Sequence, residues 1–324
     1  MKALITGGAG FIGSHLAEEL LGRGHQVIAL DNLATGNLDN IAHLRENPGF
    51  SFQNGSILET SNLSPLIEQA DCVYHLAAAV GVMHVLEHPV AALETNTRGT
   101  ENILQLAVEQ GKKKVVLAST SEVYGKTAKI PFCEDDDIIL GSTSVSRWGY
   151  ACGKAFDEFL GLAYHQQEGL PVVVLRFFNT IGPRQQGHYG MVAPRFVAQA
   201  QAGEPITVHG DGQQMRSFTY VKDVAKAVVD ISQAPAAEGQ VFNVGSNREI
   251  SINGLAQLVR QTLNSKSEIV HIPYSTAYGP GFEDPQRRLP DISKIQKYIN
   301  YNPTTDLAFI IREIADAMKA TVTR

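Results

Sequence analysis

The residues with the clearest chemical potential are Tyr150 and Lys154, which begin and end the stretch Tyr150-Ala151-Cys152-Gly153-Lys154. A helix places side chains at this spacing on one face. Because a nearby ammonium group favours the ionised phenol, we expect Lys154 to lower the pKa of Tyr150 toward working pH. Tyr150 would then act as a general base for a substrate hydroxyl. The same spacing also arises by chance on protein surfaces, so the pair needs supporting residues.

Three polar residues, Thr120, Ser121 and Glu122, follow the apolar run Lys114–Ala118, which predicts a β-strand. In a doubly wound sheet the carboxyl ends of the strands border the ligand crevice. A hydroxyl group at such an end can share the proton that moves between a substrate and Tyr150. We assign this part to Thr120.

A glycine-rich segment follows the first predicted strand, with the sequence Gly7-Gly8-Ala9-Gly10-Phe11-Ile12-Gly13. Glycines here permit a tight turn and a close approach of backbone to a pyrophosphate, and the N-terminus of the next helix favours negative charge. Asp31 ends the second predicted strand, where a carboxylate would bind the adenosine ribose hydroxyls and repel a 2′-phosphate. These features predict NAD rather than NADP. The alternative is that Asp31 caps an ordinary turn.

Short apolar runs alternate with helical patterns in the first half of the chain, an order typical of a parallel sheet with helices on both faces. The predicted strands are Ala3–Thr6, Gln26–Leu30, Cys72–Leu76, Lys114–Ala118 and Pro171–Arg176, and the predicted helices begin near Phe11, Leu63, Val90 and Gly149. The expected fold class is α/β, a Rossmann-type doubly wound parallel sheet with a smaller C-terminal α/β substrate lobe.

The chain after Asn179 has shorter elements and more turns. Its predicted elements are helices near Val192–Ala202 and Ile292–Asn300, a strand at Ile206–His209, and the helix Lys222–Gln233 and strand Val241–Val244, which should return to the main sheet. We therefore predict an NAD-binding domain of residues 1–178 plus about 222–248. The substrate lobe would comprise residues 179–221 and 249–324.

The composition argues against several classes of function. The 324 residues carry a net charge of −6 with no long basic run, so no nucleic-acid partner is predicted. Cys72, Cys133 and Cys152 form no CxxC pair, as expected for a reduced, cytoplasmic protein. We expect no signal peptide, and no run approaches the roughly 20 apolar residues of a membrane span. Glu134–Asp137 is interpreted as a solvated loop, and no metal site is predicted.

The chain resembles the extended short-chain dehydrogenase/reductase family, in particular its NAD-dependent nucleotide-sugar epimerases, dehydratases and decarboxylases. The motifs that carry the resemblance are the glycine-rich segment, Asp31, His75-Leu76-Ala77-Ala78, Thr95-Asn96, Gly99-Thr100, Thr120, Tyr150 with Lys154, Arg176-Phe177-Phe178-Asn179, Gly182-Pro183-Arg184, Arg216-Ser217-Phe218-Thr219-Tyr220-Val221 and the region of Arg288. One departure is Ser56, where the family usually has an aspartate near the adenine. Serine can still hydrogen-bond the base, so we expect a weaker contact.

The resemblance implies NAD as cofactor, a UDP-sugar as substrate and a 4-keto sugar as intermediate. Tyr150 would take the O4 proton as hydride leaves C4, while Lys154 holds the ribose and Thr120 bridges to O4. The implied catalytic residues are Tyr150, Lys154, Thr120, Ser121, Glu122 and Arg288. The implied NAD contacts are Gly7, Gly10, Phe11, Ile12, Gly13, Asp31, Asn32, Ser56, Ile57, Leu76, Ala77, Ala78, Asn96, Tyr150 and Lys154. The implied substrate contacts are Asn179, Val192, His209, Arg216 and Arg288, with a plain turn residue as the alternative for His209.

The step after oxidation depends on groups near the sugar C5. Ser121-Glu122 stands where plain 4-epimerases have small neutral residues, and Thr-Ser-Glu occurs in UDP-glucuronate decarboxylases and in GDP-mannose-type 4,6-dehydratases. Arg147-Trp148 and the segment Gln286–Asp291 resemble the decarboxylases, whose arginine in that segment reaches the sugar carboxylate. We therefore favour a UDP-glucuronate decarboxylase. A UDP-hexose or UDP-uronate 4-epimerase and a nucleotide-sugar 4,6-dehydratase are the alternatives.

A protein that only senses NAD is the alternative from another class. Such a protein would be expected to lack Tyr150, Lys154 or Thr120, and all three are present. His75, at a predicted strand end, is interpreted as packed rather than catalytic. Family members commonly pair through two helices per subunit, so a homodimer is expected.

Overall fold

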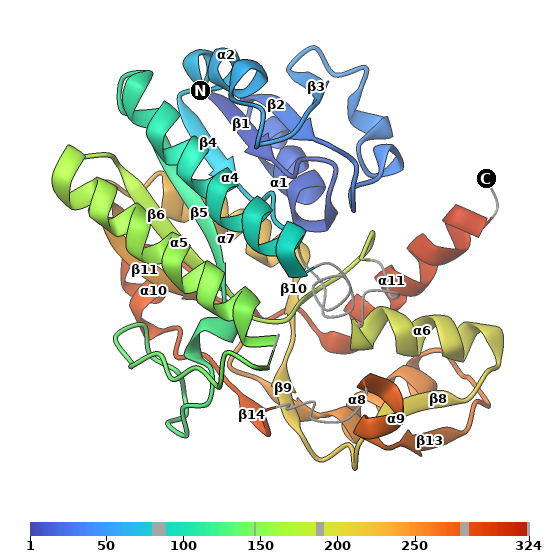
Figure 1. The fold of residues 1–324 in the computed structure, drawn as a ribbon. Coiled ribbons are helices and arrows are strands. Elements are labelled where there is room, and N and C mark those ends of the chain that lie inside the picture. Colours follow the sequence, from blue (N-terminus) through green and yellow to red (C-terminus); the bar gives the residue numbers. More distant parts are fainter. Residues whose placement is uncertain (80–88, 146, 186–190, 279–284, 323–324) are drawn as a thin grey trace.

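The computed structural model describes residues 1–79, 89–145, 147–185, 191–278 and 285–322. Its centre is a seven-stranded sheet in the order β11-β6-β5-β4-β1-β2-β3, with every neighbouring pair parallel (Figure 1). The strands are β1 (Lys2–Thr6), β2 (Gln26–Asp31), β3 (Phe50–Asn54), β4 (Cys72–His75), β5 (Lys114–Thr120), β6 (Val172–Phe177) and β11 (Gln240–Val244). The predicted Rossmann-type α/β fold is confirmed. Strand β3 is an addition that the sequence analysis does not identify.

Helices cover both faces of this sheet. They are α1 (Phe11–Gly22) and α7 (Val221–Ser232) on one face, and α2 (Thr60–Gln69), α4 (Pro89–Glu109) and α5 (Arg147–Glu168) on the other. Along β1, Ala3 and Ile5 pack in the core with α1 and α7, whereas Leu4 packs in the core with α2 and α4. Because successive side chains of a strand point to opposite faces, a strand covered on both sides must be apolar throughout.

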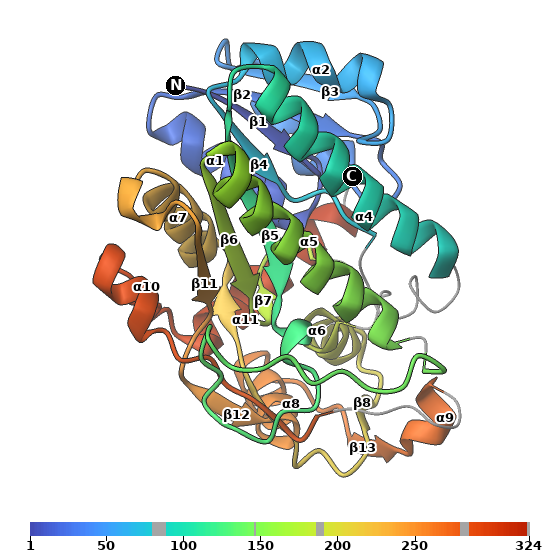
Figure 2. The same ribbon diagram turned by 60° about the vertical axis from the view of Figure 1, so that its left-hand side comes forward.

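A smaller lobe lies at one end of the sheet, in the lower part of Figure 2. Its strands are β7 (Thr180–Ile181), β8 (Ile206–His209), β9 (Met215–Ser217), β10 (Thr219–Tyr220), β12 (Glu249–Ser251), β13 (Ile269–Ile272) and β14 (Arg287–Arg288), and its helices are α6 (Val192–Ala202), α8 (Ile252–Thr262), α9 (Tyr274–Tyr278) and α11 (Leu307–Val322). Helices α6, α8 and α11 share an apolar core that includes Phe196, Leu255 and Ile311. The helix and strand predicted at 192–202 and 206–209 are confirmed.

The chain returns to the main sheet through α7 and β11, as predicted. Strand β11 is an edge strand of this sheet and pairs with β6. Helix α10 (Ser293–Tyr298) also lies on this side, against β11, and its Ile295 is buried in the core shared with α7 (Figure 2). The predicted boundary assigns this helix to the substrate lobe, whereas it packs on the main sheet. Among the helices that the structure describes, none is long and apolar enough to cross a membrane.

Candidate active site

The glycine loop runs in contact with the end of β4. Gly7 has a φ of +72°, and a Cβ on it would lie 2.9 Å from the backbone nitrogen of Ala77. A Cβ on Gly13 would lie 2.1 Å from the carbonyl oxygen of Gly7. Helix α1 begins after Gly10 with no side-chain cap and no acidic residue in its first turn. A loop whose only side chain is the methyl group of Ala9, in front of such a helix start, suits a pyrophosphate.

Asp31 lies beside this loop at the carboxyl end of β2. Its Oδ2 accepts a hydrogen bond from the Ala9 amide at 3.0 Å, and its Oδ1 accepts one from the Leu33 amide at 2.8 Å. Burial raises the pKa of Asp31, while these two amides lower it. The amides therefore fix the carboxylate at the wall of the cavity, where its remaining lone pairs can accept from ribose hydroxyls.

A cavity of about 760 Å³ extends from the glycine loop into the small lobe. All of the predicted NAD contacts except Ser56 and Asn96 line it, together with every predicted catalytic and substrate-binding residue. The Ser56 hydroxyl accepts from the Leu58 amide at 3.2 Å. Asn96 bonds both backbone groups of Ala79, at 2.7 and 3.3 Å. These bonds support the backbone beside the cavity, and the direct NAD contact expected of the two side chains stays a prediction.

Tyr150, on α5, faces the end of β5 and hydrogen-bonds Thr120. The expected lowering of its pKa is wrong. Burial raises the pKa of Tyr150 above its usual value, the carboxylates of Glu122 and Asp157 raise it further, and the bond with Thr120 acts in the opposite direction. Lys154 donates instead to Oδ2 of Asp157 at 2.7 Å, and both of these side chains are buried. The sequence analysis does not identify Asp157, although it lies one helical turn after Lys154.

Glu122 and Arg288 form an ion pair between Oε1 and Nη1 in the wall of the same cavity. Glu122 belongs to the 3-10 helix Ser121–Tyr124. The Glu122 amide donates to the Thr120 hydroxyl at 3.2 Å and so fixes the start of this helix. Arg288 comes from β14 in the small lobe, which pairs with β9. The pair therefore joins the end of β5 to the small lobe.

The small lobe contributes a cluster of cationic and polar groups. The Arg216 guanidinium donates to the carbonyl of Met215 at 2.8 Å and to that of Pro285 at 2.8 Å. His209 contacts Arg195, and burial with this positive charge lowers the pKa of His209 to about 4, so the ring is neutral at pH 7. Arg195 is not identified by the sequence analysis. Its place one turn after Val192 on α6 is the signal that could have found it.

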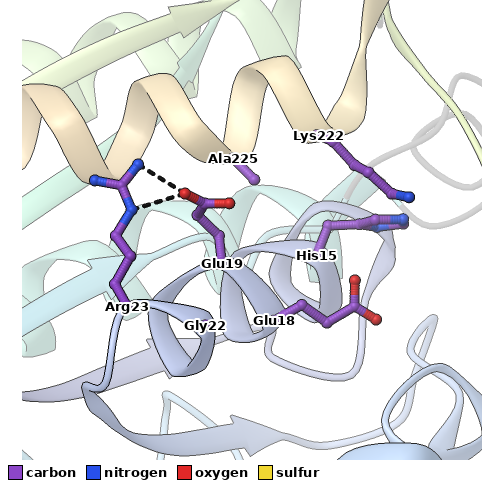
Figure 3. Close-up of a pocket in the computed structure, with 7 residues that line it drawn as sticks. All are labelled: His15, Glu18, Glu19, Gly22, Arg23, Lys222 and Ala225. Carbon is purple, nitrogen blue, oxygen red and sulfur yellow. Dashed lines mark hydrogen bonds and ion pairs between the residues drawn. The ribbon is translucent and has the colours of Figure 1, made fainter.

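A second, smaller hollow of about 290 Å³ lies between α1 and α7, away from these residues (Figure 3). Its charged side chains are paired with one another or with neighbours. Arg23 pairs with Glu19 and with Asp230, and Glu18 pairs with Arg184. None of the predicted site residues lines this hollow, and we assign its charges to the contact between the helices.

Comparison with known proteins agrees with an NAD site at the glycine loop. Residues 3–245 match the NAD dependent epimerase/dehydratase family. The chain belongs to this family. NAD is accordingly its cofactor, in agreement with the glycine loop and Asp31.

Two of the most similar relatives are decarboxylases by name. UDP-N-acetyl-alpha-D-glucosaminuronate decarboxylase of Bacillus cytotoxicus is 46% identical over 93% of this chain and 92% of its own length. UDP-glucuronic acid decarboxylase 1 of Arabidopsis thaliana is 37% identical over 95% of this chain and 67% of its own. A solved UDP-glucuronic acid 4-epimerase from Bacillus cereus, in complex with UDP-glucuronic acid and NAD, has a TM-score of 0.89 at 31% identity and covers 99% of this chain and 100% of its own.

Proposed function

We propose that this NAD-dependent enzyme decarboxylates a UDP-linked hexuronate through a 4-keto intermediate. The observation that carries the proposal is the pair of Arg288 and Glu122 in the cavity wall, near the hydrogen-bonded pair of Tyr150 and Thr120. A guanidinium group matches a carboxylate through parallel N–H donors. The C6 carboxylate of a uronate supplies that partner, whereas the hydroxymethyl group of a plain hexose does not.

Oxidation at C4 is assigned to Tyr150, Thr120 and Lys154. The ionised Tyr150 accepts the O4 proton, with the Thr120 hydroxyl bridging to O4. Bound NAD supplies the acceptor for the C4 hydride. Because the pKa of Tyr150 is raised, only a small fraction of the phenol is ionised near neutral pH, and proton abstraction depends on that fraction. Lys154 would hold the ribose, with its charge balanced by Asp157.

The ketone at C4 makes the sugar a β-keto acid. The C5–C6 bond then breaks, carbon dioxide leaves with C6, and the electron pair moves through C5 to O4. Thr120 and Tyr150 can donate hydrogen bonds to the enolate oxygen before C5 takes up a proton. Arg288 holds the carboxylate before the bond breaks, and Glu122 retains the guanidinium after carbon dioxide has left.

The substrate class has two forms that the relatives support. One decarboxylase relative acts, by its name, on a 2-acetamido uronate and the other on UDP-glucuronic acid. A 4-epimerase remains the second candidate, because the solved relative with UDP-glucuronic acid and NAD bound has the same fold over its full length.

Mass spectrometry of the product tests this proposal. The enzyme is incubated with NAD and either UDP-glucuronate or UDP-N-acetylglucosaminuronate. We expect the loss of carbon dioxide from at least one of them. An unchanged mass with inverted C4 would indicate the epimerase, and loss of water the dehydratase. Tyr150→Phe should bind NAD and give no product.

We further propose the division of labour within the chain. Residues 1–178 and about 222–248 hold NAD, and residues 179–221 and 249–324, apart from α10, hold the nucleotide sugar. Asn179, Val192, His209 and Arg216 lie toward its UDP part. The place of these four side chains in the wall of the shared cavity supports the assignment. Weaker binding of UDP after Arg216→Ala, with NAD binding unchanged, is the expected result by calorimetry.

We also propose a cytoplasmic homodimer. Apolar side chains on α4 and α5 support the dimer, since Val90, Phe156 and Phe159 are 70%, 51% and 69% exposed. The three unpaired cysteines support a reducing compartment. In sedimentation equilibrium, wild type should have the mass of a dimer and Phe159→Asp that of a monomer.

A further inference from the structure

Asn243 is a fully buried amide in strand β11, outside the cavity lining. Its Oδ1 accepts a hydrogen bond from the Tyr124 hydroxyl at 2.7 Å. Its Nδ2 donates to the carbonyl oxygens of Phe132 at 2.9 Å and Asp291 at 3.1 Å. The side chain thus uses its acceptor and both donors on three separate segments. Only an amide side chain supplies an acceptor and two donors at this size.

The bond to Tyr124 leads to Glu122. Tyr124 ends the 3-10 helix that carries Glu122, and it is fully buried with its ring stacked on Phe132 at 4.7 Å. The Glu122 amide donates to the Thr120 hydroxyl at 3.2 Å, and the Glu122 carbonyl accepts from the Gly125 amide at 3.0 Å. This short helix is therefore fixed at its start by Thr120 and at its end by the bond between Tyr124 and Asn243.

The two donated bonds lead to Arg288. Phe132 donates its amide to the carbonyl of Leu289 at 2.8 Å, and Asp291 donates its amide to the carbonyl of Phe132 at 2.9 Å. From strand β11, Asn243 donates to the carbonyls of both Phe132 and Asp291, so it holds these two paired segments together. Arg288 immediately precedes the clamped segment.

We propose that Asn243 is a positioning residue that sets the place of Glu122 relative to Arg288 and so tunes the carboxylate-binding end of the cavity. The inference rests on the proposed function, in which this pair handles the C6 carboxylate. One amide holds the chain segment of each partner, although it touches neither side chain.

The decisive variant is Tyr124→Phe, which removes one hydroxyl and releases the helix of Glu122 from Asn243. The matched control is Tyr74→Phe. Tyr74 is also fully buried, and its hydroxyl lies 2.7 Å from the Ser232 hydroxyl, away from the cavity. Each variant loses the bonds of one buried hydroxyl, to Asn243 and Arg176 at Tyr124 and to Ser232 and Cys72 at Tyr74. A structural effect alone should therefore lower the Tm of both.

The readout is the affinity of the NADH-loaded protein for UDP-glucuronate and for UDP-glucose, measured by calorimetry. The reduced cofactor cannot accept a hydride, so neither sugar is oxidised during the titration. For Tyr124→Phe we expect about tenfold weaker binding of UDP-glucuronate and little change for UDP-glucose, as a small misplacement of binding groups would give. Tyr74→Phe should keep the wild-type ratio of the two affinities. An unchanged ratio in Tyr124→Phe overturns the inference.

A second variant tests the other side of the amide. Asn243→Asp keeps the acceptor for Tyr124 but removes both donors to Phe132 and Asp291. It should therefore weaken the binding of UDP-glucuronate relative to that of UDP-glucose. If this variant does not fold, Tyr124→Phe decides alone. Carbon dioxide release by wild type is measured in parallel. Its absence overturns the proposed function, whereas the affinity ratio needs no turnover and judges Asn243 separately.

Discussion

Arg288 and Glu122 lie 166 positions apart in the sequence, yet their side chains form an ion pair where the small lobe meets the sheet. The Arg288 side chain is 9% exposed and that of Glu122 is 23% exposed. The Arg288 guanidinium is the less hydrated of the two groups, so removing Glu122 leaves a mostly buried positive charge without this partner, which costs free energy. The pair therefore holds both groups in the cavity wall, where the proposed reaction needs them for a substrate carboxylate.

Glu122→Gln and Arg288→Ala should block the step after C4 oxidation more than oxidation itself. Tyr150, Thr120 and Lys154 remain in place, so NADH absorbance near 340 nm should still appear with UDP-glucuronate. Release of carbon dioxide should fall about 100-fold, since a charge that contacts the carboxylate is lost or misplaced. Arg287→Ala is the control, because its guanidinium pairs with Glu249 at the surface. Equal losses of NADH and carbon dioxide would contradict this division of labour.

Asp157→Asn should move the pH dependence of NADH formation toward lower pH. Proton abstraction needs the Tyr150 phenolate, so the rate should rise with pH in wild type. Asp157 and Glu122 raise the pKa of Tyr150, and removing one of these charges lowers it. We expect the rising limb to shift by about one pH unit. Asp135→Asn, which removes an exposed carboxylate in a loop, should leave the limb in place. A limb that stays fixed in Asp157→Asn would remove this carboxylate from the control of Tyr150.

Asp31→Asn should relax the preference for NAD over NADP. The substitution keeps one of the two oxygens that accept from the Ala9 and Leu33 amides, and it removes the charge that repels a 2′-phosphate. We expect the ratio of the two dissociation constants, measured by fluorescence titration, to change by about tenfold. Asp39→Asn, at an exposed position a short way along the chain, is the control. If Asp31→Asn discriminates as well as wild type, the carboxylate does not select the cofactor.

The features that could be predicted from the sequence are those set by neighbours along the chain. The glycine loop, Asp31 and the pair Tyr150 and Lys154 each follow from a local turn, a strand end or a helical spacing. The pairing of Glu122 with Arg288 could not be predicted, because it depends on how β14 is placed against β9. The direction of the Tyr150 pKa shift depends on burial and on Asp157, which the pattern of Tyr150 and Lys154 does not contain. The bonds of Ser56 and Asn96 to nearby backbone could not be predicted either, because the family pattern carries no information on these partners.

His75 should make the protein less stable as the pH falls. The side chain is 1% exposed at the end of β4, with Nδ1 2.8 Å from the Thr6 hydroxyl and Nε2 3.2 Å from the Thr100 hydroxyl. Burial, with a smaller effect of the Lys154 charge, lowers the pKa of His75 to about 3. The unfolded chain, with a histidine pKa of about 6.5, therefore binds a proton that the folded protein does not. The contribution of His75 to the unfolding free energy is therefore fully present above about pH 6.5. It is lost as the pH falls toward the pKa of His75 in the folded protein.

The expected loss from His75 alone is about 2 kcal/mol of unfolding free energy between roughly pH 6.5 and pH 5. Urea denaturation at these two values measures it. His75→Gln removes the titrating group while its amide can still bond a hydroxyl, so the difference between the two pH values should shrink by about that amount. His271→Gln, at an exposed position in β13, should keep the wild-type difference. If the unfolding free energy of His75→Gln falls between the two pH values as much as that of wild type, His75 is not the source of this acid sensitivity.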